Sequence, residues 1–288
     1  EIESVGFSLF LNYNRTIMNH AQTDVIVVGA GIAGLMCAYH CRSLGYSVSI
    51  VQQGDGTHTS SYYAQGGIAC SWNSDDSIVS HCQDTLDAGA QLCDKDVVQQ
   101  VCEQGPNIIQ SLMDMGVHFD QSIAGDVSLA KEGAHSQRRI LHVKDFTGKA
   151  LVDGIRRALA ESASCQWFNF SKVTNLLVTD AHCHGVVLQQ GNDQVTIQSK
   201  VVVLASGGYA SLYSRSTTPP SAVGDVIGMA YQAGCTLRDL EMIQFHPTAL
   251  DIPHQRSFLI SEAVRGEGAV LRNVSGDAFM KGLHPLSD

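Results

Sequence analysis

Charged residues are scarce in this sequence: Asp, Glu, Lys and Arg make up 16% of its 288 residues, against about 25% in a typical soluble domain. A disordered chain or a coiled coil would need many more, so both classes are excluded. Prolines number six, and there is no low-complexity linker or internal repeat. No apolar run approaches the ~20 residues that cross a bilayer. The first residues lack the basic start and long apolar core of a signal peptide, so we expect no membrane partner.

Basic residues are scarcer than acidic ones. Lys and Arg number 18 and Asp and Glu 28, which leaves a net charge of −10. This balance argues against nucleic acid and anionic membranes as general partners. Cys-x-x-Cys pairs are also lacking, and the nine cysteines are scattered and odd in number. Such usage is typical of reduced thiols, so we expect a cytoplasmic protein.

Apolar residues (44%) and 27 glycines supply a sizeable core. Residues 24–28 predict a buried parallel strand, residues 32–44 an apolar helix and residues 47–51 a second strand. The first strand leads into the helix through Gly29-x-Gly31-x-x-Gly34. In such a loop the glycines permit a tight turn, close approach of a pyrophosphate and close helix–strand packing. The unit therefore predicts a dinucleotide site, although a glycine turn that only packs a helix on a strand shows the same pattern.

The end of the second strand lacks the Asp or Glu that usually accepts the ribose hydroxyls. It reads Val51-Gln-Gln-Gly54, and no Arg nearby favours a phosphorylated ribose. A Gln oxygen accepts such a hydroxyl more weakly because it carries no charge. These residues leave NAD, NADP and FAD open.

Further along, the pattern alternates between helix and strand. Residues 77–116 predict helices, with Pro106 at a helix start, and residues 148–162 and 224–234 predict two more. Residues 167–204 predict an antiparallel meander with turns at Asp180 and 191–193. Within it, residues 201–204 predict a second buried strand.

Five strings taken in order carry a more specific signal. They are Ser60–Gly67 (SSYYAQGG), Lys131–His142 (KEGAHSQRRILH), Gly224–Asp225, Glu241–Ala249 (EMIQFHPTA) and Ser261–Gly268 (SEAVRGEG). From about Thr23 to Met280 the chain resembles the L-aspartate oxidases, a family of the succinate dehydrogenase and fumarate reductase flavoprotein superfamily. The resemblance implies an α/β fold. It consists of an FAD-binding, Rossmann-like domain of the glutathione-reductase type, with a parallel sheet and an antiparallel β-meander, and the start of an α+β capping domain.

The resemblance also implies the cofactor residues. They are Gly29, Ala30, Gly31, Ile32, Ala33, Gly34, Gln53, Ser60, Ser61, Tyr62, Tyr63, Ala64, Gln65, Gly66, Gly67 and Asp225. Val226 departs from the family, which usually has a second glycine there. Succinate dehydrogenases bind the flavin covalently through a histidine at the position of Ser60, so the resemblance implies non-covalent FAD.

The substrate residues follow from the same match. Glu132 corresponds to the carboxylate that orients the substrate's amino group, and His246 is the second catalytic candidate. Gln244, Ser261 and Arg265 correspond to substrate-binding positions. Two of these residues also have a simpler interpretation: Glu132 as a solvated loop carboxylate and His246 as a core histidine.

Other polar groups are expected to be structural. Arg138 and Arg139 are better interpreted as ion-pair partners than as catalysts, and Cys37 and Cys41 as packing residues on one helix face. Residues 180–184 carry adjacent Asp, His and Cys without a distant second pair, so we expect no metal.

We expect three segments: a disordered extension at 1–22, the FAD-binding domain at 23–242 and an incomplete capping domain at 243–288. The family's proton-transferring arginine, a further histidine and arginine and the last FAD-binding strand would all lie downstream, so we expect the chain to be truncated at its C-terminus.

The implied reaction is oxidation of L-aspartate to iminoaspartate, with dioxygen or fumarate as acceptor and hand-off to quinolinate synthase in NAD synthesis. The alternatives are a fumarate reductase or succinate dehydrogenase-like flavoprotein and a catalytically dead FAD-binding fragment.

Overall fold

The computed structural model describes residues 18–19, 22–160, 164–253 and 257–283. Most of the extension expected to be disordered lies outside these residues. Within it, Met18–Asn19 form strand β1, which pairs in parallel with residues Val195 and Thr196. Backbone pairing therefore orders at least this part of the segment.

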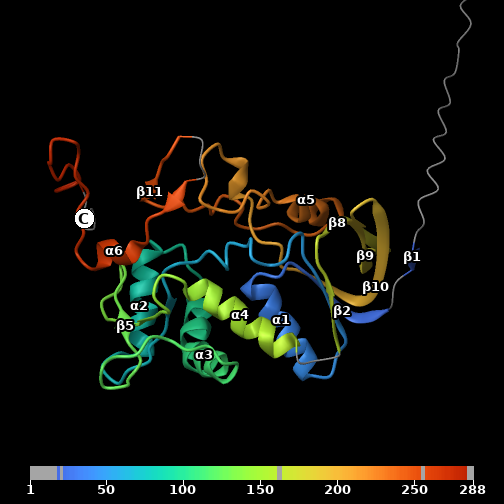
Figure 1. Ribbon diagram of the computed structural model, residues 1–288, viewed down its shortest axis with the longest axis horizontal. Coiled ribbons are helices and arrows are strands. Elements are labelled where there is room, and N and C mark those ends of the chain that lie inside the picture. Colours follow the sequence, from blue (N-terminus) through green and yellow to red (C-terminus); the bar gives the residue numbers. More distant parts are fainter. Residues whose placement is uncertain (1–17, 20–21, 161–163, 254–256, 284–288) are drawn as a thin grey trace, which may run out of the picture.

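The largest sheet of the described chain is mixed and has seven strands, and its strands β2 and β8–β10 lie on the right in Figure 1. Its order is β7-β3-β2-β10-β9-β8, with β1 also on β10. Strands β7, β3, β2 and β10 run parallel, whereas β10, β9 and β8 form the expected antiparallel meander. The bounds are Thr23–Val28 (β2), Val48–Val51 (β3), Cys165–Phe168 (β7), Ser171–Thr179 (β8), His182–Gln190 (β9) and Asp193–Leu204 (β10).

The parallel strands carry apolar side chains on both faces, because the helices cover one face and the meander covers the other. Val27 and Ile50 belong to a cluster with the helices, whereas Ile26 and Val28 pack with residues of the meander such as Leu188. Since successive side chains of a strand point to opposite faces, an unbroken apolar run suits a strand buried on both sides. The prediction of a buried strand at residues 24–28 is confirmed.

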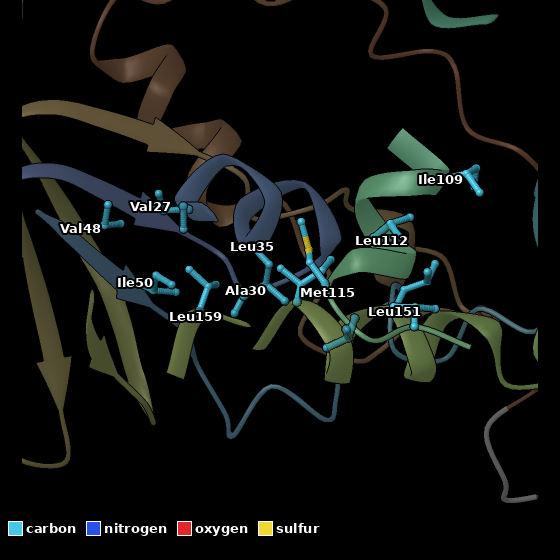
Figure 2. Close-up of a cluster of buried hydrophobic side chains, with 14 of the residues drawn as sticks. Val27, Ala30, Leu35, Val48, Ile50, Ile109, Leu112, Met115, Leu151 and Leu159 are labelled. Atoms are coloured by element: carbon cyan, nitrogen blue, oxygen red, sulfur yellow. The ribbon is translucent and has the colours of Figure 1, made fainter. Parts of the chain in front are cut away.

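Helices α1 (Ile32–Ser43) and α4 (Thr147–Ala160) pack together on one face of the sheet, and α2 (Ile78–Ala88) and α3 (Lys95–Asp114) lie beyond them. Figure 2 shows Leu35 of α1 between the strand residues and Leu112 and Met115, at the end of α3. This packing fixes α1, and hence the glycine loop before it, against β2. The fold is α/β, as expected.

Two expectations about these elements are wrong. Pro106 lies inside α3, not at a helix start, because burial of Cys102, Ile109 and Leu112 stabilises one long helix through it. Residues 201–204 are the end of β10 and are not buried, since Val201 is 50% and Leu204 37% exposed. The end of the helix expected at 148–162 falls outside the described residues.

The remaining described elements are short. Strands β4 (Ile68–Ala69), β6 (Ile140–Leu141) and β5 (Leu129–Ala130) form a small sheet, and β11 (Ala249–Leu250) pairs with β12 (Phe258–Leu259). A 3₁₀ turn (Ala210–Leu212), α5 (Asp225–Gln232) and α6 (Glu262–Gly266) complete the described chain. Among the described helices, none combines the length and apolar character of a membrane span.

Candidate cofactor and substrate site

A first cavity of about 590 Å³ lies where β2, β3 and β10 end and α1 begins. Its walls come from the glycine loop, the turns after β3 and β10, the start of β8 and the start of α5. The lining residues include Gly29, Ala30, Gly31, Ile32, Ala33, Gln53, Ser60, Ser61, Tyr63, Gly207 and Asp225. The carboxyl ends of parallel strands are where ligands bind in this class of fold.

The glycines of the loop are required by the backbone. Gly29 has a φ of +112°, and a Cβ on it would overlap the carbonyl of Ala205. A Cβ on Gly34 would overlap the carbonyl of Gly29. The loop thus brings α1 against the strands as closely as backbone permits.

The N-terminus of α1 faces this cavity. Its N-cap is Gly31, which supplies no side-chain hydrogen bond, and its first turn contains no acidic residue. The amide of Ile32 donates to the Ser61 hydroxyl at 3.0 Å. Backbone amides and the positive end of a helix dipole attract anions, so this end of the cavity suits a phosphate.

At the ribose end the two glutamines differ. Gln52 is buried, its Nε2 donates to Asn169 Oδ1 at 2.5 Å, and Arg156 donates to its Oε1. Both glutamines line the cavity, and Gln53 is the exposed one. The sequence alone does not distinguish the two side chains, and the structure favours Gln53 as the ribose contact.

Asp225 lines the same cavity from the first residue of α5. Its Oδ1 accepts from the amide of Val226 at 2.9 Å. Its Oδ2 forms an ion pair of 2.9 Å with Lys172, in a geometry that makes no hydrogen bond. The carboxylate is therefore oriented by the helix start and partly neutralised by β8.

A second cavity of about 340 Å³ adjoins the first, because Ile32 and Ser61 line both. Its wall brings together residues from four of the five strings found in the sequence. The residues are Ile32, Ser61, Ala64, Gly66, Gly67, Ile68, Glu132, Thr147, Gly148, Leu151, His246, Leu259, Ser261 and Glu262. The two cavities are therefore neighbours with Ile32 and Ser61 in their common wall.

Glu132 is the most perturbed carboxylate of this second cavity. Burial and then the nearby charge of Glu262 raise its pKa. Its Oε1 occupies the space that a Cβ on Gly66 would need, and Glu262 lies similarly against Gly133. The cavity thus holds two facing carboxylates, which suits a cationic group such as an ammonium.

His246 and Ser261 also line the second cavity. His246 Nδ1 lies 2.9 Å from the carbonyl oxygen and 3.2 Å from the amide of Thr248, so its tautomer decides which bond it makes. Ser261 is buried at the start of α6. Both side chains are polar groups that a carboxylate could accept from.

The structure does not bring every expected residue to a cavity wall. Gln244 is exposed and Arg265 half-buried, and neither lines the two cavities. Gly34, Tyr62 and Gln65 are also outside both linings. Conversely, Glu262 and Thr147 line the second cavity without having been expected there. Glu262 belongs to a quoted string and could have been found by its type, whereas Thr147 carried no signal.

The residues expected to be structural behave so. Arg139 is fully buried between Asp76 and Asp84, and Arg138 pairs on the surface with Glu267. Cys37 and Cys41 pack against the core. In the described part of the chain no three His, Cys, Asp or Glu residues are grouped as metal ligands.

Comparison with known proteins places the fold in a class. The model of the FAD binding domain family matches residues 24–288, so the chain belongs to this family. It is 40% identical over 271 residues to L-aspartate oxidase 2-b, chloroplastic, of Nicotiana tabacum, covering 89% of this chain and 42% of that protein. It is 39% identical to L-aspartate oxidase of Neisseria meningitidis over 261 residues, covering 89% and 52%. The chain thus spans about half the length of these curated relatives.

Solved structures agree with the fold. A mutant of the E. coli quinol fumarate reductase subunit FrdA superposes with a TM-score of 0.86 at 29% identity, covering 94% of this chain and 47% of that one. Mycobacterium smegmatis Sdh1 in complex with UQ1 gives 0.82, also at 29% identity, with 94% and 48% covered.

FAD is the cofactor of this domain family, and the residues present fit it. The N-cap of α1, Gly31, has no side chain, and the absence of a Cβ there leaves room for a pyrophosphate beside Ser61. The first cavity, of about 590 Å³, reaches from the glycine loop to Gln53 and Asp225. Gln65 Oε1 is buried next to Gly66 in the chain and accepts no hydrogen bond from the described residues, although Gln65 lines neither cavity.

Proposed function

We propose that this chain carries the FAD-binding part of an enzyme that oxidises L-aspartate to iminoaspartate. The observation that supports this best is the second cavity, where Glu132, His246 and Ser261 converge on Gly66 and Gly67. These residues come from four separate segments, so their meeting is a property of the fold. The relatives named L-aspartate oxidase support the choice of substrate.

In the proposed reaction, the substrate Cα loses a hydride and its nitrogen a proton, which leaves a C=N bond. The chemistry that FAD would supply when bound is acceptance of this electron pair, with dioxygen or fumarate as the final acceptor. Glu132 would bind the substrate ammonium, because a carboxylate between Gly66 and Glu262 has no cationic partner among the described lining residues of the second cavity. His246 and Ser261 would contact a substrate carboxylate as hydrogen-bond donors. Gln244 and Arg265 stay predicted substrate contacts. Ser60 supports non-covalent binding, since a serine forms no histidyl–flavin bond.

The test is a visible spectrum of the purified protein at its full natural length, with and without L-aspartate under anaerobic conditions. We expect flavin absorbance that bleaches on addition of L-aspartate. A protein bleached by succinate alone would be the dehydrogenase-like alternative, and bound flavin that neither substrate bleaches would indicate a catalytically dead module. Flavin released by acid precipitation would support non-covalent FAD.

The partner and location predictions go further than this test. Hand-off of iminoaspartate to a quinolinate synthase and a cytoplasmic location stay predictions of the sequence. The hand-off follows from the proposed reaction, and the location follows from the scattered, odd number of cysteines.

A further inference from the structure

We propose that Arg139 is a positioning residue for Glu132 and so for recognition of the substrate's ammonium group, an inference that rests on the proposed function. Arg139 touches neither cavity. It acts through the loop of residues 131–139, which begins with the Glu132 segment and ends at Arg139 itself.

The guanidinium of Arg139 is held by two carboxylates with no exposure to solvent. Its Nε and one terminal nitrogen donate to Asp76 at 2.9 and 2.8 Å, and the other terminal nitrogen donates to Asp84 at 2.7 Å. Ser80 accepts a fourth bond at 3.1 Å. A bidentate pair fixes the orientation of the guanidinium as well as its position.

Asp84 also holds the middle of the loop. Its Oδ2 accepts from both the amide and the hydroxyl of Ser136, at 2.8 and 2.7 Å. The loop is thus tied to α2 at two points, Ser136 and Arg139. Glu132 is four residues before the first of these points, and the amide of His135 donates to its carbonyl at 3.4 Å.

Arg139 is also connected to the segment that contains Gly66, Gly67 and strand β4, which lies on the other side of Glu132. Its carbonyl accepts from the amide of Cys70 at 2.9 Å, and the next two residues, Ile140 and Leu141, pair with β4. A Cβ on Gly67 would overlap the carbonyl of Leu141. One buried residue therefore sets the distance between the Glu132 loop and the backbone of Gly66 and Gly67.

This arrangement predicts an effect that depends on the substrate. L-Aspartate has an ammonium group for Glu132 to bind, whereas fumarate is a dicarboxylate of similar length without one. If the cluster acts through Glu132, weakening it raises the KM for L-aspartate and leaves the KM for fumarate unchanged. A general loss of folding or of cofactor would change both.

The experiment uses Asp84→Asn and Arg139→Lys in the protein at its full natural length. Asp84→Asn keeps the Asp76 pair, and Arg139→Lys keeps the charge but not the fork of donors. We expect the KM for L-aspartate, with a dye acceptor, to rise between about 10- and 100-fold, as a displaced positioning contact does. The KM for fumarate with a reduced dye, and the FAD content, should stay at the wild-type value. Lys200→Gln, which breaks the exposed Lys200–Asp24 pair, is the control.

A double variant tests whether Glu132 is the intermediary. In Glu132→Gln, adding Asp84→Asn should raise the KM for L-aspartate no further, because coupled residues are not additive. Full additivity, or equal loss for both substrates, would overturn the proposal. Amide hydrogen exchange gives a readout without turnover: Asp84→Asn should speed exchange in residues 131–138 and not in β2. Unchanged exchange in residues 131–138 would overturn the role proposed for Arg139, whatever the substrate is. A wild-type protein that does not oxidise L-aspartate would instead reject the proposed function and leave the exchange result to decide the role of Arg139.

Discussion

The carboxylate of Glu132 fills the space beside Gly66 that a side chain there would require. Gly66→Ala should therefore displace Glu132 without unfolding the chain, since the obstructing atom is the end of a flexible side chain. We expect the KM for L-aspartate to rise by about tenfold or more, with a change in stability of about 0.5 kcal/mol or less. Steady-state kinetics and urea unfolding measure the two effects. Gly228→Ala, where a Cβ meets open space, is the control; equal kinetics for both variants would contradict the prediction.

Gly29 has no such tolerance, because its obstructing neighbour is backbone. Gly29→Ala places a Cβ on the Ala205 carbonyl at a φ of +112°. We expect a loss of stability of at least about 1–3 kcal/mol from strain alone, and loss of FAD on gel filtration. Gly45→Ala has a φ of +87° but open space around it, so it isolates the strain from the overlap. The prediction fails if both variants unfold at the same urea concentration.

Ser61 supplies a hydroxyl to the start of α1, which has no capping side chain of its own. Ser61→Ala should lower the free energy of unfolding of the FAD-free protein by about 0.5–2 kcal/mol, the usual cost of a lost helix cap. Ser43→Ala removes a hydroxyl from the exposed other end of the same helix, where Ser43 bonds the Tyr39 carbonyl. Urea unfolding of the two variants should differ, with Ser43→Ala close to wild type.

Thr147, the first residue of α4, links this helix to the backbone of Gly66. Its hydroxyl donates to the Gly66 carbonyl at 2.6 Å and accepts from the Val143 amide at 2.9 Å, in a buried setting. Thr147→Val keeps the shape but leaves both backbone groups unpaired, at about 1–3 kcal/mol for each. Thr147→Ser keeps the hydroxyl and should recover most of this loss. Thermal unfolding of both variants checks the order; a serine variant as unstable as the valine variant would show that packing, not the hydroxyl, matters.

His81 should make the fold sensitive to acid. Burial and then the charge of Arg139 lower the pKa of His81. The same two causes lower the pKa of the neighbouring His135. The negative charges of Asp76 and Asp84 oppose the shift at both histidines. A folded-state pKa below the unfolded value means that the unfolded chain binds the proton more readily. The free energy of unfolding therefore falls as pH falls below the ordinary value of about 6.5. His81→Gln should flatten, but not abolish, this slope in melting temperature measured between about pH 7 and pH 5. An unchanged slope would contradict the assignment.

Local patterns predicted the parts of this fold that local physics decides. The glycine loop, α1 and the two-sided strand β2 follow from backbone sterics and apolar periodicity, so residues 24–45 were predictable. The start of α3 was not, because tertiary burial of Ile109 and Leu112 overrides the preference of Pro106 for a first turn.

The site was predictable in composition but not in arrangement. Matching strings identified Glu132, His246 and Ser261, and the structure brings these three to one cavity. The resemblance pointed to Gln53, but the sequence could not show that the side chain of Gln52, which lines the same cavity, is bound to Asn169, because the two residues are 117 positions apart. The ion-pair role expected of Arg139 is confirmed, but its partners could not be predicted, since Asp76 and Asp84 are more than fifty residues away in the chain.

Strand β10 pairs with β9 over its first half and with β2 over its second. A single continuous strand thus joins the meander to the turn at Ala205–Gly208, which lines the first cavity. Local opening at the turn between β9 and β10 would extend along this strand to the first cavity. The meander and the Ala205–Gly208 turn should therefore unfold together. Ligand binding in the cavity should slow amide hydrogen exchange in both.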